Sequence, residues 1–212
     1  MAEYYFEKPE ILRSIDDFNN FFPGIKIIIS PNTRVILSGR IIIEDYIEFN
    51  LQCECKNIYL GFGSKIINSK IGNQTKVRSY SIIENSSIGD NCTIGPNAFI
   101  RDKTHISANS IIGANVEVAR SICGENVQVA HFAFLGDAKI DNRVIIGAGV
   151  VFSNYFDGAR SQTVIGENTL IGSNSTIVAP VKIGKSVIVG AASLITKDVD
   201  DFQKIIQKRT LL

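Results

Sequence analysis

The sequence predicts an all-β solenoid, a parallel β-helix built from hexapeptide repeats with a short helix at each end. Three observations predict it. An aliphatic residue returns about every six positions, a glycine often follows it, and neither helical nor hairpin spacing competes with this repeat. The repeat positions are Ile71, Val77, Ile83, Ile88, Ile94, Ile100, Ile106, Ile112, Val118, Val129, Leu135, Ile140, Ile146, Ile165, Ile171, Ile177, Ile183, Val189 and Ile195.

Each hexad supplies one short strand and one tight corner. The aliphatic side chain points inward, and we expect the glycine after it to adopt backbone angles that other residues avoid. Three such sides close a triangular coil of about 18 residues, and successive coils hydrogen-bond at about 4.8 Å, the spacing of neighbouring strands. Where the step shortens to five, as between Ile83 and Ile88, the register resumes at once.

The repeat defines one long domain with two short ends. A weaker version of it extends the predicted β-helix back to residue 25, so that the helix covers 25–199. Residues 1–24 are predicted to form a helical cap, because Pro9 suits a first turn and apolar residues follow at helical spacing. Residues 200–212, which contain "DDFQKIIQKR", are predicted to form a closing helix and tail. Both ends would cover strand edges.

Composition limits the class of ligand. The chain is 45% hydrophobic and 20% charged, with a net charge of +1, so no basic surface predicts nucleic acid or membrane as a partner. No apolar run approaches the roughly 20 residues that cross a bilayer, and the N-terminus does not resemble a signal peptide. The four cysteines lack zinc-site spacing, and as free thiols they suit a reducing compartment. We therefore expect a cytoplasmic protein with a small ligand.

The repeat is interrupted by "SNYFDGARSQT", which predicts an inserted loop at about 153–163. Binding and catalytic residues concentrate on loops held by a rigid scaffold. Just before it, His131 stands beside a corner of the hexad "VAHFAF" rather than in the inward position, which makes it a candidate site residue. The other histidine, His105, is interpreted as structural. Two distant histidines cannot supply the three ligands of a catalytic zinc site, so no metal is predicted.

Two stretches carry a family resemblance. "VAHFAFLGDAKIDNRVIIGAGVVFSNYFDGA" and "TVIGENTLIGSNSTIVAPVKIGKSVIVGAASLITKDV" resemble the C-terminal acetyltransferase domain of the bifunctional N-acetylglucosamine-1-phosphate uridyltransferase/glucosamine-1-phosphate acetyltransferase. The resemblance runs from about Ile88 to Val199, roughly half of the chain. It implies a left-handed β-helix, a homotrimer, and acetyl-CoA as the co-substrate that acylates an amino sugar.

The resemblance also implies roles for individual residues. His131 is implied to be the general base, and Asn154 and Tyr155 match a catalytic pair in which the amide positions the acyl group or stabilises the oxyanion. The acceptor sugar is implied to contact Arg101, which matches a phosphate-binding arginine, and Arg160, which stands where a lysine is usual. The residues implied to bind the cofactor are Ala148, Ser173, Ala191 and Lys208.

Three positions depart from the family pattern. Ala119 stands where a second phosphate-binding lysine is usual, and Phe134 and Ile145 replace a tyrosine and an asparagine that contact the sugar. The acceptor pocket is therefore expected to be less polar, as suits a deoxy sugar. We expect an acetyl-CoA-dependent N-acetyltransferase acting on an amino sugar, either a sugar phosphate or a nucleotide-linked sugar, other than glucosamine 1-phosphate.

Two alternatives remain open at this point. One is O-acetyl transfer to a sugar or small alcohol. The other is a non-catalytic β-helix that serves assembly or regulation, which would be favoured if Phe132, Phe134 and Phe156 filled the space around His131.

Overall fold

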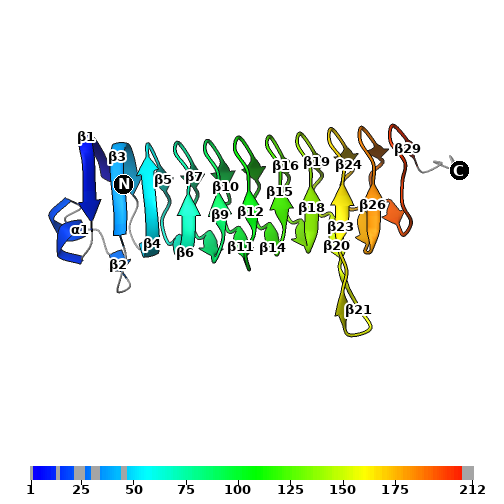
Figure 1. Cartoon of the computed structure of the whole chain (residues 1–212), viewed down its shortest axis with the longest axis horizontal. Helices are drawn as coiled ribbons and strands as arrows, with labels where there is room; N and C mark the ends of the chain where they lie inside the picture. Colours follow the sequence, from blue (N-terminus) through cyan, green and yellow to red (C-terminus); the bar gives the residue numbers. More distant parts are fainter. Residues whose placement is uncertain (1, 13–14, 22–26, 30–33, 44–46, 207–212) are drawn as a thin grey trace, which may run out of the picture.

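The chain folds into a left-handed parallel β-helix whose coils stack along the long axis of the molecule (Figure 1). The computed structural model describes residues 2–12, 15–21, 27–29, 34–43 and 47–206. This confirms the predicted fold class. Successive strands of a face pair in parallel at an offset of one coil, as in Thr93 with Ile111 and His105 with Ile122. None of the helices in the described ranges is long and apolar enough to cross a membrane.

Three sheets form the three faces of the prism. Face 1 contains β3 (Arg34–Ile43), β5 (Tyr59–Leu60), β7 (Lys76–Val77), β10 (Thr93–Ile94), β13 (Ile111–Ile112), β16 (Gln128–Val129), β19 (Ile145–Ile146), β24 (Leu170–Ile171), β27 (Ile188–Val189) and β29 (Lys204–Ile205). Face 2 contains β2 (Ile27–Ile29), β4 (Ile47–Lys56), β6 (Lys65–Ile71), β8 (Ile82–Glu84), β11 (Phe99–Arg101), β14 (Glu117–Ala119), β17 (Phe134–Gly136), β20 (Val151–Ser153), β25 (Thr176–Val178) and β28 (Leu194–Ile195). Face 3 contains β9 (Ser87–Ile88), β12 (His105–Ile106), β15 (Ile122–Cys123), β18 (Ala138–Ile140), β23 (Thr163–Ile165), β26 (Val181–Ile183) and the end of β6.

The core is the stack of inward side chains, one from each strand. Every aliphatic repeat position from Ile71 to Ile195 is buried, as the period predicted, and Phe152 continues the same period as a fully buried ring. In register, Ile112 stacks between Ile94 and Val129. Because each residue faces its own counterpart in the coils on either side, the repeat buries a continuous apolar column.

The corners corrected one expectation about glycine. Most of the corner residues with positive φ are not the glycines that follow the aliphatic positions, and many are asparagines: Asn91, Asn97, Asn109, Asn115, Asn126, Asn168 and Asn174, with φ between 53° and 61°. Asparagine tolerates this left-handed region. Glycine is needed instead where coils touch. A Cβ on Gly166 would lie 2.6 Å from the carbonyl carbon of Gly184, and one on Gly89 would lie 2.7 Å from the nitrogen of Ala108.

The N-terminal cap differs from the predicted helical cap. Residues 2–12 form β1 (Ala2–Leu12), which pairs antiparallel with β3, and only α1 (Ile15–Phe21) is helical. Helical spacing was misleading here because the free edge of β3 offers hydrogen-bond partners to an extended segment. Pro9, which has no N–H, lies where the register of this pair shifts between Phe6 and Glu10. In Figure 1, β1 and α1 lie at one end of the prism.

The predicted C-terminal helix is also wrong in its described part. Residues 201–202 form a turn, and β29 extends face 1 by pairing with β27. The repeat in fact continues one step further, because Ile205 pairs with Val189. Residues 207–212 lie outside the described residues.

The interruption of the repeat is a hairpin. β21 (Tyr155–Phe156) and β22 (Ala159–Arg160) pair antiparallel and project from the prism between β20 and β23 (Figure 1). The parallel register continues past the hairpin, with Val151 paired to Thr176. An insertion at a corner leaves the coil intact, because only the connection between two faces is lengthened.

Candidate functional site

Four of the predicted site residues stack at one corner. This corner joins face 1 to face 2, and we call it the His131 corner. His131, Ala148, Ser173 and Ala191 occupy it in successive coils. The backbone links them in order: Gly149 N–H donates to the His131 carbonyl at 3.0 Å, Asn174 N–H to the Ala148 carbonyl at 2.8 Å, and Ala192 N–H to the Ser173 carbonyl at 2.8 Å. Ala148, Ser173 and Ala191 therefore form a column of small side chains on one side of the predicted base.

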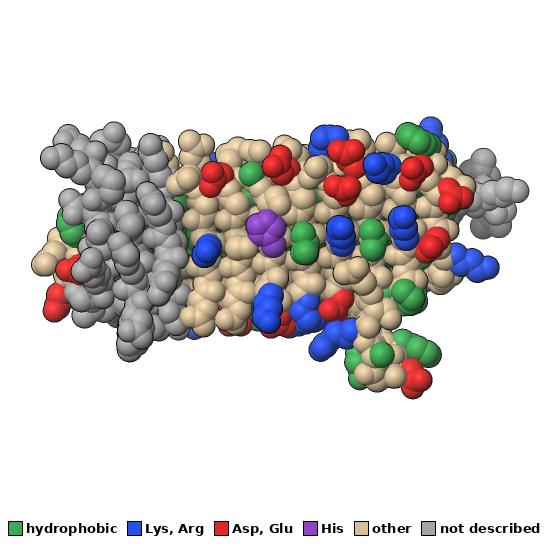
Figure 2. Space-filling model, viewed as in Figure 1, with side chains coloured by type: hydrophobic (Ala, Val, Ile, Leu, Met, Phe, Trp, Pro, Cys, Tyr) green, Lys and Arg blue, Asp and Glu red, His purple; other side chains and the backbone are tan. Residues whose placement is uncertain are grey.

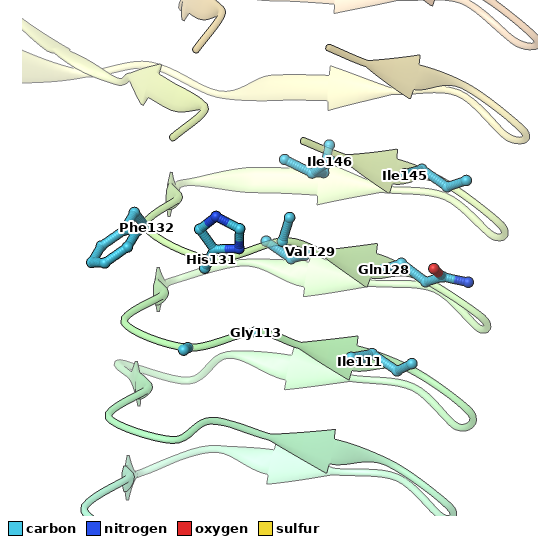
Figure 3. A pocket seen from close by; sticks show the side chains of 10 residues that line it. Ile111, Gly113, Gln128, Val129, His131, Phe132, Ile145 and Ile146 are labelled. Atoms are coloured by element: carbon cyan, nitrogen blue, oxygen red, sulfur yellow. The ribbon is translucent and has the colours of Figure 1, made fainter. Parts of the chain in front are cut away.

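A groove opens on face 1 beside His131. It has a volume of about 410 Å³ and is lined mostly by apolar groups, among them Ile111, Val129 and Ile145, together with Gln128. Figure 3 shows the side chains of Ile111, Gln128 and Ile145 one above another on successive strands, with His131 and Phe132 on the neighbouring turn. Ile145, predicted to contact the acceptor, thus lies in the same groove as the predicted base.

The imidazole of His131 is exposed to solvent. Its ring meets that of Phe132 edge to face, with centroids 5.6 Å apart. Among the described residues, neither ring nitrogen has a hydrogen-bond partner. Phe132 is 64% exposed and Phe156 84% exposed, and Phe134 lies on face 2, so these three rings leave the space around His131 open. A histidine in this position can exchange a proton with a bound ligand.

A second group of predicted residues lies at another corner. This corner joins face 2 to face 3, and we call it the Asp137 corner. Asn154, at the base of the hairpin, is buried, and its side-chain amide donates to Asp137. Arg120, one coil further, donates to both carboxylate oxygens of Asp137, at 2.8 Å from Nε and 3.0 Å from Nη2, and to Asp102 at 2.9 Å from Nη1. A ladder of side-chain hydrogen bonds therefore ends at Asn154.

The charges in this ladder stabilise one another. Burial alone would raise the pKa of the Asp137 carboxyl, but hydrogen bonds from Arg120 and Asn154 lower the pKa below its usual range. The hydrogen bond with Asp137 raises the pKa of Arg120. Asp137 therefore remains ionised and holds the amide of Asn154 at a fixed place.

The remaining predicted acceptor residues lie close to this corner. Arg101 ends β11 on face 2, where it pairs with Glu117 and Asp102. Phe134 is half-buried on β17 of the same face. Tyr155 and Arg160 are exposed and pair with each other across the hairpin. Lys208 lies outside the described residues.

The two corners are not adjacent within one chain. Phe132 and Asp137 are five residues apart across this face, roughly 16 Å for an extended strand. His131 with its small-residue column, and Asn154 with its hairpin, are therefore on opposite edges of face 2. A single chain places the predicted base and the predicted Asn–Tyr pair apart.

Sequence reasoning missed the carboxylates of this network. Asp137 belongs to the quoted motif "LGDA", Asp102 follows Arg101, and Glu117 stands two residues before Ala119, yet none was assigned a role. Their one available signal was spacing: residues 102, 120, 137 and 154 recur at 17 or 18, the length of one coil. Among the residues that the structure describes, no group of three His, Cys, Asp or Glu side chains is placed to hold a metal ion.

Comparisons with known proteins agree with this fold and repeat. The family model described as "Bacterial transferase hexapeptide (six repeats)" matches residues 68–102, 85–120 and 162–197. Bifunctional protein GlmU of Ruthia magnifica subsp. Calyptogena magnifica is 49% identical over 138 residues, which cover 65% of this chain and 30% of that protein. GlmU of Acinetobacter baylyi is 40% identical over 168 residues, covering 79% of this chain and 35% of that protein. The chain thus spans about a third of these relatives.

Among solved structures, LpxA, a UDP-N-acetylglucosamine acyltransferase from Bacteroides fragilis, has a TM-score of 0.63 with this chain at 21% identity, covering 75% of this chain and 66% of that one. This likeness supports the fold. The GlmU matches confirm the resemblance inferred from the motifs. Repeat, coil geometry and sequence similarity together identify the chain as a hexapeptide-repeat protein with a left-handed β-helix, similar over about two thirds or more of its length to part of GlmU.

Proposed function

We propose that this protein is an acetyl-CoA-dependent N-acetyltransferase that acts on an amino sugar, with His131 as the general base. The observation that carries the proposal is the His131 corner, where an exposed imidazole with no hydrogen-bond partner among the described residues stands between an open groove and a column of small residues. The similarity to GlmU supports the same reaction class.

His131 would remove a proton from the ammonium of the acceptor or from the attacking amine. Imidazole changes its charge near neutral pH, and a base positioned in this way contributes about 10²- to 10⁴-fold to the rate. The groove beside the ring is where the acceptor would lie, since it is apolar, open and lined by Ile145.

The column above His131 suits a thin, extended acyl donor. Ala148, Ser173 and Ala191 carry only small side chains, so the backbone of this corner is accessible to a pantetheine chain along the prism. The thioester carbonyl would then face the end of the column at which His131 stands. Lys208 stays a predicted contact to the cofactor.

A second copy of the chain would complete the site. Because Asn154 and Tyr155 are on the far edge of face 2, they can reach the acyl group at His131 only from a neighbouring protomer, whose hairpin projects from the prism. A homotrimer brings each hairpin to the next chain's His131 corner. In this arrangement Asn154 positions the acyl group or stabilises the oxyanion.

O-acetyl transfer to a sugar or small alcohol is the second candidate, since the same base can deprotonate a hydroxyl. A non-catalytic role would be favoured if aromatic side chains filled the space around His131. Phe132 and Phe156 are exposed and the groove is open, so this support is missing.

Titration calorimetry with acetyl-CoA, followed by thiol release with a panel of amino sugars and their hydroxyl analogues, tests the proposal. We expect acetyl-CoA binding and thiol release only with amines. Release with hydroxyl analogues alone would favour O-acetyl transfer. Acetyl-CoA binding without thiol release on any acceptor would favour a regulatory role. Absence of acetyl-CoA binding would refute both N-acetyl and O-acetyl transfer.

A further inference from the structure

We propose that the acceptor bound beside His131 presents an uncharged, hydroxyl-bearing part of the amino sugar, and not a phosphate, to Arg101 of the neighbouring protomer. This inference rests on the proposed function and narrows its acceptor to amino sugars that carry no phosphate at this subsite. The observation behind it is the ion pairing around Arg101.

The guanidinium of Arg101 is already engaged by two carboxylates. Nε donates to Glu117 at 2.9 Å, Nη2 lies 2.7 Å from the same oxygen, and Nη1 pairs with Asp102. The guanidinium carbon Cζ lies over the Phe99 ring, 5.6 Å from its centre. The bidentate fork that would bind a phosphate is therefore used within the chain.

Among the described residues, no buried cation of the ladder is free to replace Arg101. Arg120 is held by Asp137 and Asp102, Arg160 acts on the charge of Asp137, and Ala119, in register between Arg101 and Gly136, is fully buried without any charge. Two guanidinium groups, those of Arg101 and Arg120, thus share three carboxylates. The other described basic residues at this corner, Lys103 and Arg160, are exposed to solvent and form no ion pair with a described residue. On the face seen in Figure 2, acidic and basic side chains both occur along the prism.

The two carboxylates beside Arg101 disfavour a phosphate and can accept a hydrogen bond from a hydroxyl. A phosphate dianion would have to displace a carboxylate from Arg101 while lying within contact distance of Glu117 and Asp102, and like charges at that distance repel. A sugar hydroxyl can donate to Glu117 and accept from Arg101 at the same time, so both groups keep a partner. The side chains of Arg101, Glu117 and Asp102 are 27%, 37% and 45% exposed, so an acceptor can reach all three.

The test measures inorganic phosphate binding by calorimetry together with thiol release from acetyl-CoA in the presence of glucosamine or glucosamine 1-phosphate. The variant is Asp102→Asn with Glu117→Gln, which removes both charges and keeps the shapes. Asparagine also tolerates the left-handed backbone of residue 102, where φ is 58°. Glu125→Gln is the matched control, because Glu125 is an exposed carboxylate at the corner between faces 3 and 1.

We expect wild type and the Glu125→Gln control to bind phosphate no better than about 10 mM, and the double variant to bind it about tenfold more tightly, since each partly exposed ion pair contributes about two- to five-fold. Adding Arg101→Ala to the double variant should abolish the gain. If the double variant does not fold, Asp102→Asn alone should give a two- to five-fold gain. In the thiol assay, the ratio of kcat/KM for glucosamine 1-phosphate over glucosamine should rise in the double variant.

Submillimolar phosphate binding by wild type that Arg101→Ala removes would overturn the inference, as would a double variant that binds phosphate no better than wild type. These readouts do not depend on turnover. If no amine releases thiol while the phosphate results are as expected, the proposed function fails and only the exclusion of phosphate from Arg101 stands.

Discussion

The change Asp137→Asn tests the ladder that holds Asn154. Asparagine has nearly the shape of aspartate, but it has no charge, and its amide nitrogen would face the donors of Arg120 and Asn154. We expect lower stability and, because Asn154 loses its fixed place, slower acetyl transfer. The change acts through charge and hydrogen bonding alone.

The magnitude follows from the contacts. Asp137 accepts two hydrogen bonds from Arg120, at 2.8 and 3.0 Å, and one from Asn154. The side chains of the ion pair are 23% and 17% exposed, so solvent screens it in part. A partly screened pair contributes about 1 kcal/mol and a hydrogen bond to a charged group about 1.5–3 kcal/mol. Because asparagine keeps one acceptor oxygen, we expect a loss of about 1–2 kcal/mol in the free energy of unfolding.

Urea unfolding at several pH values measures this loss. With a slope of about 2 kcal/mol per molar urea, the midpoint should fall by about 0.5–1 M at pH 7. The pKa of Asp137 is lowered by folding, so its stabilisation is fully present above the unfolded pKa of about 3.9 and disappears as the pH falls through the lower, folded value. The difference between wild type and variant should therefore be constant from pH 8 to about 5 and shrink below pH 4.

Two results would refute this reasoning. One is an unchanged midpoint at pH 7, and the other is a difference that persists undiminished in acid. The control is Glu125→Gln, which removes an exposed carboxylate at another corner and should leave the midpoint unchanged at either pH.

Three further predictions concern the base, the hairpin and the coil contacts. His131→Ala should lower thiol release by about 10²- to 10⁴-fold and leave the circular dichroism spectrum intact; an unaltered rate would show that His131 is not the base. Replacing residues 155–160 by a short glycine and serine turn should keep the melting temperature within a few degrees and abolish transfer, since the hairpin lies outside the coil; a retained rate would remove the hairpin from the site. Gly166→Ala should cost about 1–3 kcal/mol in unfolding experiments, because its Cβ would lie 2.6 and 2.7 Å from backbone atoms of Gly184. Gly158→Ala at the hairpin tip, with no atom within 4 Å, should cost only about 1 kcal/mol from its φ of 78°, and equal losses would contradict the packing argument.

Much of the fold could be predicted because the six-residue spacing of aliphatic residues recurs in every coil. Positions from Ile71 to Ile195 were assigned to the core from spacing alone, and all are buried. The ends could not be assigned in this way. Residues 2–12 have apolar spacing that also fits a helix, and the free edge of β3 decides that they form a strand. Likewise, β29 forms because β27 leaves backbone groups to pair.

The residues of the candidate site could be predicted from motifs, whereas their positions relative to one another could not. His131, Ala148, Ser173 and Ala191 were assigned from motifs, and their stacking at one corner follows from the 17- and 18-residue coil with one insertion. The role of glycine was only partly foreseen, because contact between coils, as at Gly166, is a property of the stack and not of any one hexad.

The sequence by itself determined the repeat, the inward side chains, the position of the insertion and the residues of the "AH" and "NY" pairs, since each of these is a local pattern that recurs or stops at a defined residue. Only the tertiary structure decided which of them share a corner. It placed His131 and Asn154 on opposite edges of face 2, and it paired Arg101 with Glu117 and Asp102. The reason is that residues one coil apart in sequence become neighbours at about 4.8 Å in the fold. Oppositely charged side chains on adjacent coils can then form ion pairs.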